Sequence, residues 1–185
     1  ARSRRAILRF RFNHVIESIA YITLPWVMQN AFVQPDGSPR PIPYRLDKQH
    51  WFAQLENGSE IWMGGLDDKE RTEKILGKEY ATMLLNECSQ IPWVSRNVAV
   101  TRLAQNVTQS MRGVQASPLQ PRMYYDCNPP NKGHWAYRLF VCKEDPTTGH
   151  PLPYPDDYAW FGPMNPRDNA ENLPRDYERT LESLP

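Results

Sequence analysis

The chain has 185 residues, of which 40% are hydrophobic, which is enough for one packed domain but leaves little room for a second. Its 22 basic and 21 acidic side chains nearly cancel, so the net charge argues neither for nor against binding to nucleic acid. The three cysteines lack metal-ligand spacing and fit a reducing compartment better than a disulfide framework, and no apolar run is long enough to cross a bilayer.

The first predicted elements are a strand and a helix. Basic and apolar residues alternate over residues 5–12, which predicts a strand whose arginines, Arg9 and Arg11, face solvent. Contact with nucleotide or DNA is the alternative for these arginines. Apolar residues then recur at helical spacing after Asn13, although Pro25 is expected to disturb the last turns of this helix. Prolines and a glycine at 33–43 predict a surface loop.

Short strands and helices alternate along the rest of the chain. Strands are predicted at 44–46, 51–55, 60–64, 80–85 and 123–125, and helices at 67–76, 95–106 and 176–184. The dipeptide Asn57-Gly58 is the strongest short-range signal for a hairpin. The uninterrupted apolar run at 80–85 is typical of a strand that is covered on both faces. In the helix at 95–106, Val98 is expected to face inward.

The end of the chain is rich in proline. Residues 134–141 are expected to form a short helix or an extended arm, and little regular structure is expected from 145 to 174. The alternation of strands and helices upstream predicts an α/β fold with a mostly parallel sheet flanked by helices. Because such sheets bind ligands at the carboxyl ends of their strands, these ends are where chemistry is expected.

One of these strand ends is Asn86-Glu87, which follows the apolar run at 80–85. A buried strand that ends in a polar residue and a glutamate is the Walker B arrangement of P-loop NTPases. In that arrangement the first residue, usually aspartate, reaches magnesium, and the glutamate activates the attacking water. Asn86 takes the metal-side position here, where its neutral oxygen is a weaker partner for a magnesium-bound water than a carboxylate. For an isolated match, the alternative is a strand that surfaces into a polar loop.

The other strand end is Asp126-Cys127-Asn128. In P-loop ATPases the strand beside the Walker B strand presents a polar residue that senses the γ-phosphate. The amide of Asn128 can donate to a phosphate and accept from a water. An Asx-Pro turn, in which Asn128 satisfies only local backbone groups, is at least as good an interpretation on spacing alone.

An ordered series of motifs runs through nearly the whole chain. It includes Phe-Arg-Phe-Asn-His at 10–14, Asn-Gly-Ser-Glu-Ile-Trp at 57–62, Gly-Gly-Leu-Asp-Asp-Lys-Glu-Arg at 64–71, Glu-Lys-Ile-Leu-Gly at 73–77, Leu-Leu-Asn-Glu-Cys-Ser-Gln-Ile-Pro at 84–92, Thr-Arg-Leu-Ala-Gln at 101–105, Tyr-Tyr-Asp-Cys-Asn-Pro-Pro at 124–130, Gly-His-Trp at 133–135, Met-Asn-Pro at 164–166 and Glu-Asn-Leu-Pro at 171–174. This series resembles phage and prophage terminase large subunits, which are two-domain motors. Their ATPase domain drives double-stranded DNA into a procapsid, and their nuclease domain cuts the DNA concatemer.

The resemblance implies a three-layer P-loop NTPase-like (ASCE) fold with an added β-hairpin and a Pro-rich C-terminal tail. Residues 1–145 are then part of the ATPase domain, and residues 146–185 are a Pro-rich segment with a short helix that leads toward the nuclease domain. The implied cofactors are ATP and Mg²⁺. The implied partners are double-stranded DNA, a portal protein, a small terminase subunit and further copies of the chain in a ring, with no membrane. The implied location is the host bacterial cytoplasm, transiently on the procapsid.

The resemblance also assigns the site residues. Glu87 is the catalytic glutamate, Asn86 is its metal-side neighbour, and the two hold Mg²⁺ through water. Asn128 belongs to the motif that couples hydrolysis to DNA movement, and Asp126 beside it is expected to contribute to cofactor binding.

An arginine or lysine that completes the nucleotide site is expected from Arg102, Arg71 or Lys74.

Two departures from the family pattern stand out. The Gly-rich Walker A loop expected upstream of Arg5 and the acidic nuclease cluster expected beyond Pro185 are both absent. Because the Walker A loop holds the phosphates and the metal, we expect the chain by itself neither to bind ATP tightly nor to hydrolyse it. The alternative function is a degenerate prophage remnant that acts only as a non-enzymatic interaction domain.

Overall fold

The computed structural model describes residues 2–67, 69–111, 114–162, 164–174 and 176–183. The chain forms two compact units, Ala1–Pro130 and Asn131–Pro185, which are described separately. Among the described residues, no helix combines the length and the apolar character that crossing a membrane requires. The predicted division of the chain at residue 145 concerns functional modules and stays a prediction.

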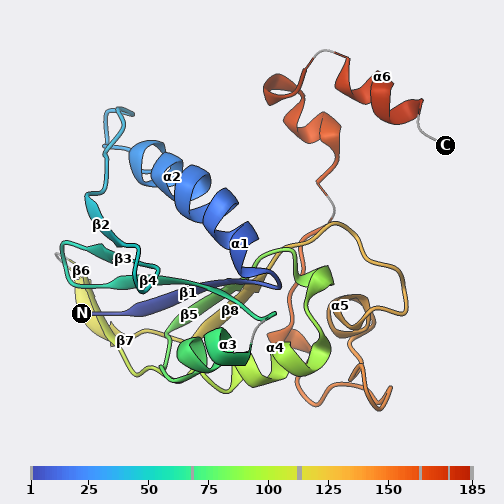
Figure 1. The fold of residues 1–185 in the computed structure, drawn as a ribbon. Coiled ribbons are helices and arrows are strands. Elements are labelled where there is room, and N and C mark those ends of the chain that lie inside the picture. Colours follow the sequence, from blue (N-terminus) through green and yellow to red (C-terminus); the bar gives the residue numbers. More distant parts are fainter. Residues whose placement is uncertain (1, 68, 112–113, 163, 175, 184–185) are drawn as a thin grey trace. The chain divides into compact units, whose positions relative to one another are not determined.

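The first unit is built around a six-stranded sheet with the order β2-β3-β4-β1-β5-β8 (Figure 1). Its strands are β1 (Arg4–Arg9), β2 (Tyr44–Asp47), β3 (Phe52–Leu55), β4 (Glu60–Gly65), β5 (Thr82–Leu85) and β8 (Arg122–Tyr125). Strand β1 pairs in parallel with β4 and β5, and β8 pairs in parallel with β5, whereas β2 and β3 are antiparallel additions. This mostly parallel sheet confirms the α/β prediction.

Helices cover both faces of this sheet (Figure 1). One face carries a continuous helical run made of α1 (Phe12–His14), the π-helical segment η1 (Val15–Thr23) and α2 (Leu24–Asn30). The other face carries α3 (Lys69–Leu76) and α4 (Trp93–Val100). The core on the first face consists of buried apolar side chains from the helical run and the sheet, namely Val15, Ile16, Ile19, Ala20, Leu24, Met28, Ala53 and Met63.

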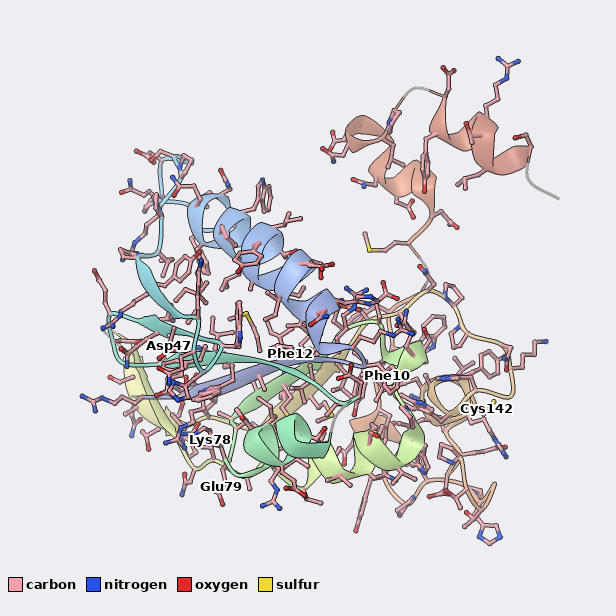
Figure 2. The ribbon with its side chains drawn as sticks, viewed as in Figure 1. Phe10, Phe12, Asp47, Lys78, Glu79 and Cys142 are labelled. Carbon is pink, nitrogen blue, oxygen red and sulfur yellow. The ribbon has the colours of Figure 1, made fainter. Side chains whose placement is uncertain are left out.

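The sequence led us to expect that Pro25 disturbs the last turns of the long helix, but the helical run continues through Pro25 to Asn30. The widened π turns end directly before the proline, where the Leu24 N–H donates to the Ile19 carbonyl, and Pro25 then occupies the first turn of α2. Proline is tolerated in the first turn of an α-helix because no N–H is required of it there and its fixed φ is already helical. Phe10 and Phe12, labelled in Figure 2, lie where β1 passes into this helix.

The hairpin predicted from Asn57-Gly58 is confirmed by β3 and β4. Gly58 has a φ of 77°, and its N–H donates to the Leu55 carbonyl at 2.8 Å, while the Asn57 side chain accepts the Ser59 N–H at 2.9 Å. The turn depends on these short-range contacts, which explains why the sequence alone predicted it.

The helix predicted at 95–106 is displaced, since α4 spans Trp93–Val100. The prediction that Val98 faces inward is wrong, because Val98 is exposed whereas Arg96 and Ala99 are buried. The Arg96 guanidinium lies over the rings of Trp93 and Tyr125, and its Nε donates to the Tyr125 hydroxyl at 2.9 Å. These neutral and aromatic partners let a charged residue take an inward position that a hydrophobic pattern assigns to valine.

A small hairpin that the sequence did not predict completes the first unit, with β6 (Thr108–Met111) pairing with β7 (Val114–Pro118). The second unit contains α5 (Trp135–Tyr137) and the π-helical segment η3 (Arg138–Cys142), which agrees with the helical alternative predicted for residues 134–141. It continues through the 3₁₀ turns η4 (Pro155–Asp157) and η5 (Pro166–Asn172) to α6 (Tyr177–Glu182).

Candidate functional site

The two polar strand ends identified in the sequence lie side by side. Strands β5 and β8 are parallel neighbours with Leu85 opposite Tyr125, so Asn86 and Asp126 leave the same edge of the sheet. Strand β1, on the other side of β5, ends at this edge with Arg9. We call this edge, formed by Arg9, Asn86, Glu87, Asp126 and Asn128, the carboxyl edge.

Asp126 joins the two strand ends through its side chain. The Nδ2 of Asn86 donates to both carboxylate oxygens, at 2.8 and 3.0 Å, and the backbone N–H of Glu87 donates to Oδ1 at 2.8 Å. The backbone carbonyl of Asp126 accepts the N–H of Cys88 at 2.8 Å. Three consecutive residues after β5 are therefore held by one residue after β8.

Glu87 has an unusual backbone conformation, with φ 54° and ψ 48°, in the left-handed region. For a residue with a Cβ this conformation costs roughly 1–2 kcal/mol. It reverses the chain direction directly after β5 and leads into the 3₁₀ turn η2 (Cys88–Gln90), in which the Gln90 N–H donates to the Glu87 carbonyl at 2.9 Å. Such strained non-glycine residues cluster at functional sites.

Arg9 supplies a positive charge beside Glu87. One guanidinium nitrogen lies 3.6 Å from Glu87 Oε1, and another donates to the Ser18 hydroxyl at 2.9 Å. The Arg9 Nε is buried without a hydrogen-bond partner in the part of the chain that the structure describes. Our preferred interpretation of Arg9 as a solvent-facing residue is therefore wrong, whereas Arg11 is exposed.

Cys88 lies directly behind the carboxyl edge and is buried. Burial raises the pKa of its thiol, and the neighbouring Cys127 thiol and Asp126 carboxylate raise it further. A raised pKa disfavours the thiolate, which is the nucleophilic form of cysteine.

Asn128 is exposed in the loop after β8, and its side chain makes no hydrogen bond with any other described residue. The Asx-Pro turn, which would require the side chain to satisfy local backbone groups, is thus not seen among the described contacts. The amide of Asn128 is available for a ligand at the same edge as Glu87.

Of the three residues proposed as arginine or lysine sensors, the structure describes only the side chain of Arg102. The backbone carbonyl of Arg102 accepts the Tyr80 N–H at 2.8 Å, which places Arg102 near the amino end of β5, opposite Glu87. Arg71 and Lys74 belong to α3, but their side chains lie outside the described residues.

A cavity of about 560 Å³ lies at the opposite, amino edge of the sheet and contains none of the candidate site residues. Its charged and amide side chains include Arg2, Arg4, Arg45, Glu56, Glu60 and Gln105. Groups of three or more histidine, cysteine, aspartate or glutamate residues able to hold a metal do not occur within the described ranges. Metal binding at the carboxyl edge thus needs an amide oxygen, water or ligand oxygens in addition to Glu87 and Asp126.

A mostly parallel sheet with helices on both faces, with Glu87 two residues after the interior strand β5, fits an α/β, P-loop-like fold. More particularly, the chain has the fold seen in a phage large terminase. Over 100% of its length it matches the large terminase of a thermophilic bacteriophage with a TM-score of 0.69 and 12% identity, covering 38% of that chain.

Two ligand complexes of the same thermophilic phage protein give similar matches. The complex with ADP has a TM-score of 0.64 with 13% identity, and the complex with ATP-γ-S has 0.63 with 13% identity. Each again covers 100% of this chain, but 38% and 37% of the terminase. No protein-family model and no curated protein matches the chain. At these identities the likeness shows the fold, and the chain spans well under half of the terminase.

Proposed function

We propose that this chain is the central part of the ATPase domain of a viral DNA-packaging motor, and that Glu87 is the general base of ATP hydrolysis. The observation that carries the proposal is the position of Glu87. It follows the interior strand β5 at the carboxyl edge, where its carboxylate lies 3.6 Å from Arg9 and its backbone N–H donates to Asp126. Ligands bind at this edge in open α/β sheets.

The side chains at the carboxyl edge suit a magnesium–nucleotide complex because they offer oxygen atoms, which Mg²⁺ prefers. Asn86 and Glu87 would hold the metal through water, with Asp126 beside them. Bound Mg²⁺ and ATP would supply the transferable phosphoryl group and neutralise its charge. The Glu87 carboxylate, which is partly exposed, can accept a proton from a water aligned with the γ-phosphate.

Asn128 is proposed to couple hydrolysis to movement. Its exposed amide, one strand away from Glu87, can donate to a phosphate and respond to its loss. The substrate to be moved is double-stranded DNA, and the proposed partners are a portal protein, a small terminase subunit and further copies of the chain in a ring. The similar solved structures are of a phage large terminase, two of them with ADP or ATP-γ-S, which supports a nucleotide as the ligand.

The test uses the protein in which this chain is continuous with a phosphate-binding loop. We expect Glu87→Gln to lower ATP turnover by about 10²–10⁴-fold, the range of a general base, while ATP affinity stays within about threefold. Glu56→Gln, which alters an exposed glutamate of the β3–β4 turn, is the matched control and should retain full turnover. Undiminished turnover in the Glu87 variant would remove this residue from its proposed role.

The isolated chain provides a second test. Because the sequence contains no Gly-rich loop ending in Lys-Ser/Thr, we expect a calorimetric titration with Mg·ATP to detect no binding in the micromolar range. Micromolar affinity in this titration would mean that the nucleotide is held by groups other than those proposed.

A further inference from the structure

The Asp126 carboxylate is committed to the neighbouring strand end rather than left free. Its two oxygens accept the Asn86 amide at 2.8 and 3.0 Å, and Oδ1 also accepts the Glu87 N–H at 2.8 Å. These bonds are charge-assisted, and such bonds are roughly twice as strong as neutral ones. The Asp126 carboxylate thus holds both residues of the Asn86-Glu87 pair, the first by its side chain and the second by its backbone.

The first consequence concerns the orientation of Asn86. A carboxylate only accepts hydrogen bonds, so the Nδ2 end of the amide must face Asp126 and the Oδ1 end must face away. Turning the amide over would place its oxygen against a negatively charged oxygen. With Asp126 in place, Asn86 therefore presents an oxygen, the atom type that a hard cation or its bound water requires.

The second consequence concerns Glu87. Its left-handed backbone, at φ 54° and ψ 48°, is unfavourable for a residue with a Cβ and needs support from its surroundings. The bond from the Glu87 N–H to the Asp126 carboxylate, together with the bond from Cys88 N–H to the Asp126 carbonyl at 2.8 Å, holds the chain on both sides of Glu87. The direction in which the Glu87 side chain leaves the sheet is set by this reversal.

We infer that Asp126 is the positioning residue of the carboxyl edge. It turns the Asn86 oxygen toward the site and fixes the backbone from which Glu87 acts. The Walker B arrangement places a carboxylate at the position of Asn86, whereas in this chain the carboxylate stands one strand away, on Asp126. This inference rests on the proposed function of Glu87, but it is tested separately, by variants of Asp126 and Asn86.

If Asp126 acts in this way, the amide and the carboxylate can exchange places. In Asp126→Asn alone, Asn86 is free to turn and present its NH₂ group, and we expect kcat to fall about tenfold to a hundredfold with KM changed less than about threefold. In Asn86→Asp alone, two carboxylates adjoin and repel, with a similar loss. In the double variant, the asparagine introduced at position 126 donates to the new carboxylate and its oxygen still accepts the Glu87 N–H, so kcat should recover to within about threefold of the original.

These kinetics are measured in the protein that carries the phosphate-binding loop, with Asp156→Asn as a control at an exposed aspartate of the second unit. Recovery of kcat in the double variant supports positioning by Asp126, since a merely destabilising change would not be rescued by a second one. Full turnover in Asp126→Asn, or a double variant no better than the worse single variant, overturns the inference. If Glu87→Gln is also fully active, the proposed function fails as well, which separates the two outcomes.

A readout independent of activity uses the 185-residue chain itself. We expect hydrogen exchange of the Glu87 amide, followed by NMR, to be at least about tenfold faster in Asp126→Ala than in the unchanged chain. The exchange rate of the Glu87 amide should change little in the double variant Asn86→Asp, Asp126→Asn, which keeps an acceptor at position 126. The amide of the buried Leu8 in β1 serves as an internal reference for global stability. An unchanged Glu87 exchange rate in Asp126→Ala would show that Asp126 does not hold this backbone.

Discussion

Strand β1 carries an arginine–glutamate pair at each end, and the two pairs are built differently. At the amino edge, Arg4 lies 3.4 Å from Glu60, its direct neighbour on β4, and the side chains are 43% and 24% exposed. At the carboxyl edge, Arg9 lies 3.6 Å from Glu87, and the exposures are 16% and 31%. The first pair is an ordinary cross-strand contact, whereas the second joins a strand to a strained turn.

The surroundings of the two glutamates sharpen this difference. Glu60 lies in regular strand and also accepts the Trp62 Nε1–H at 2.8 Å. Glu87 has a left-handed backbone, and its partner Arg9 has a buried Nε without a hydrogen-bond partner among the described residues. Of the two glutamates, Glu87 is therefore the one with an unfavourable local environment, a feature that often marks functional sites.

The largest expected effect on the free energy of unfolding comes from the amino edge, where Tyr80 is buried. Burial raises the pKa of its phenol; nearby Arg4 lowers it and Glu60 raises it, to smaller extents. The hydroxyl donates to the Ile75 carbonyl at 2.9 Å. The folded state holds the proton more tightly than the unfolded chain, so the stabilisation is complete below about pH 10 and is lost as the pH rises further, by about 1.4 kcal/mol per pH unit.

This pH dependence is measured by urea unfolding at pH values of about 8 and about 11, on either side of the ordinary tyrosine pKa. We expect Tyr80→Phe to remove most of the alkaline loss of stability, while Tyr124→Phe, at a half-exposed tyrosine, leaves it unchanged. An equal alkaline loss in the Tyr80 variant would mean that other groups cause it.

The next difference concerns the backbone at the two glutamates. Because glycine adopts the left-handed conformation without strain, we expect Glu87→Gly to raise the free energy of unfolding by about 1 kcal/mol. The same change at Glu60, in regular strand, should lower it by about 1 kcal/mol. Chemical denaturation of both variants measures the two signs, and a destabilised Glu87→Gly variant would argue against strain at this turn.

The smallest difference lies in the ion pairs themselves. Double-mutant cycles with Arg→Met and Glu→Gln changes should give coupling energies of about 0.2–1 kcal/mol for both pairs. We expect the less exposed Arg9–Glu87 pair to lie at the upper end and to lose less of its coupling energy in about 1 M salt. A larger and less salt-sensitive coupling for Arg4–Glu60 would reverse the ranking.

The parts of this fold that depend on local chemistry could be predicted from the sequence. Asn57-Gly58 predicted the hairpin, and the uninterrupted apolar run at 80–85 predicted the strand that precedes Asn86-Glu87, which is observed as β5. Features that depend on strand order could not be predicted. The contact of Arg9 with Glu87 arises because β1 and β5 are neighbours, although the residues are far apart in the chain.

Two further failures have physical causes. The buried position of Arg96 depends on the rings of Trp93 and Tyr125, of which the second comes from β8, so periodicity within one helix could not reveal it. The contacts of Asp126 with Asn86 and Glu87 depend on the parallel register of β5 and β8. A register can be inferred only after the strand order is known.

The most direct test compares the two ends of β1 in a single assay. ATP turnover is measured in the protein that contains the phosphate-binding loop, with Glu87→Gln at the carboxyl edge and Glu60→Gln at the amino edge. We predict a loss of about 10²–10⁴-fold for the Glu87 variant and turnover within about threefold of the unchanged protein for the Glu60 variant. Equal turnover in the two variants would contradict the claim that the carboxyl edge of this sheet carries the chemistry.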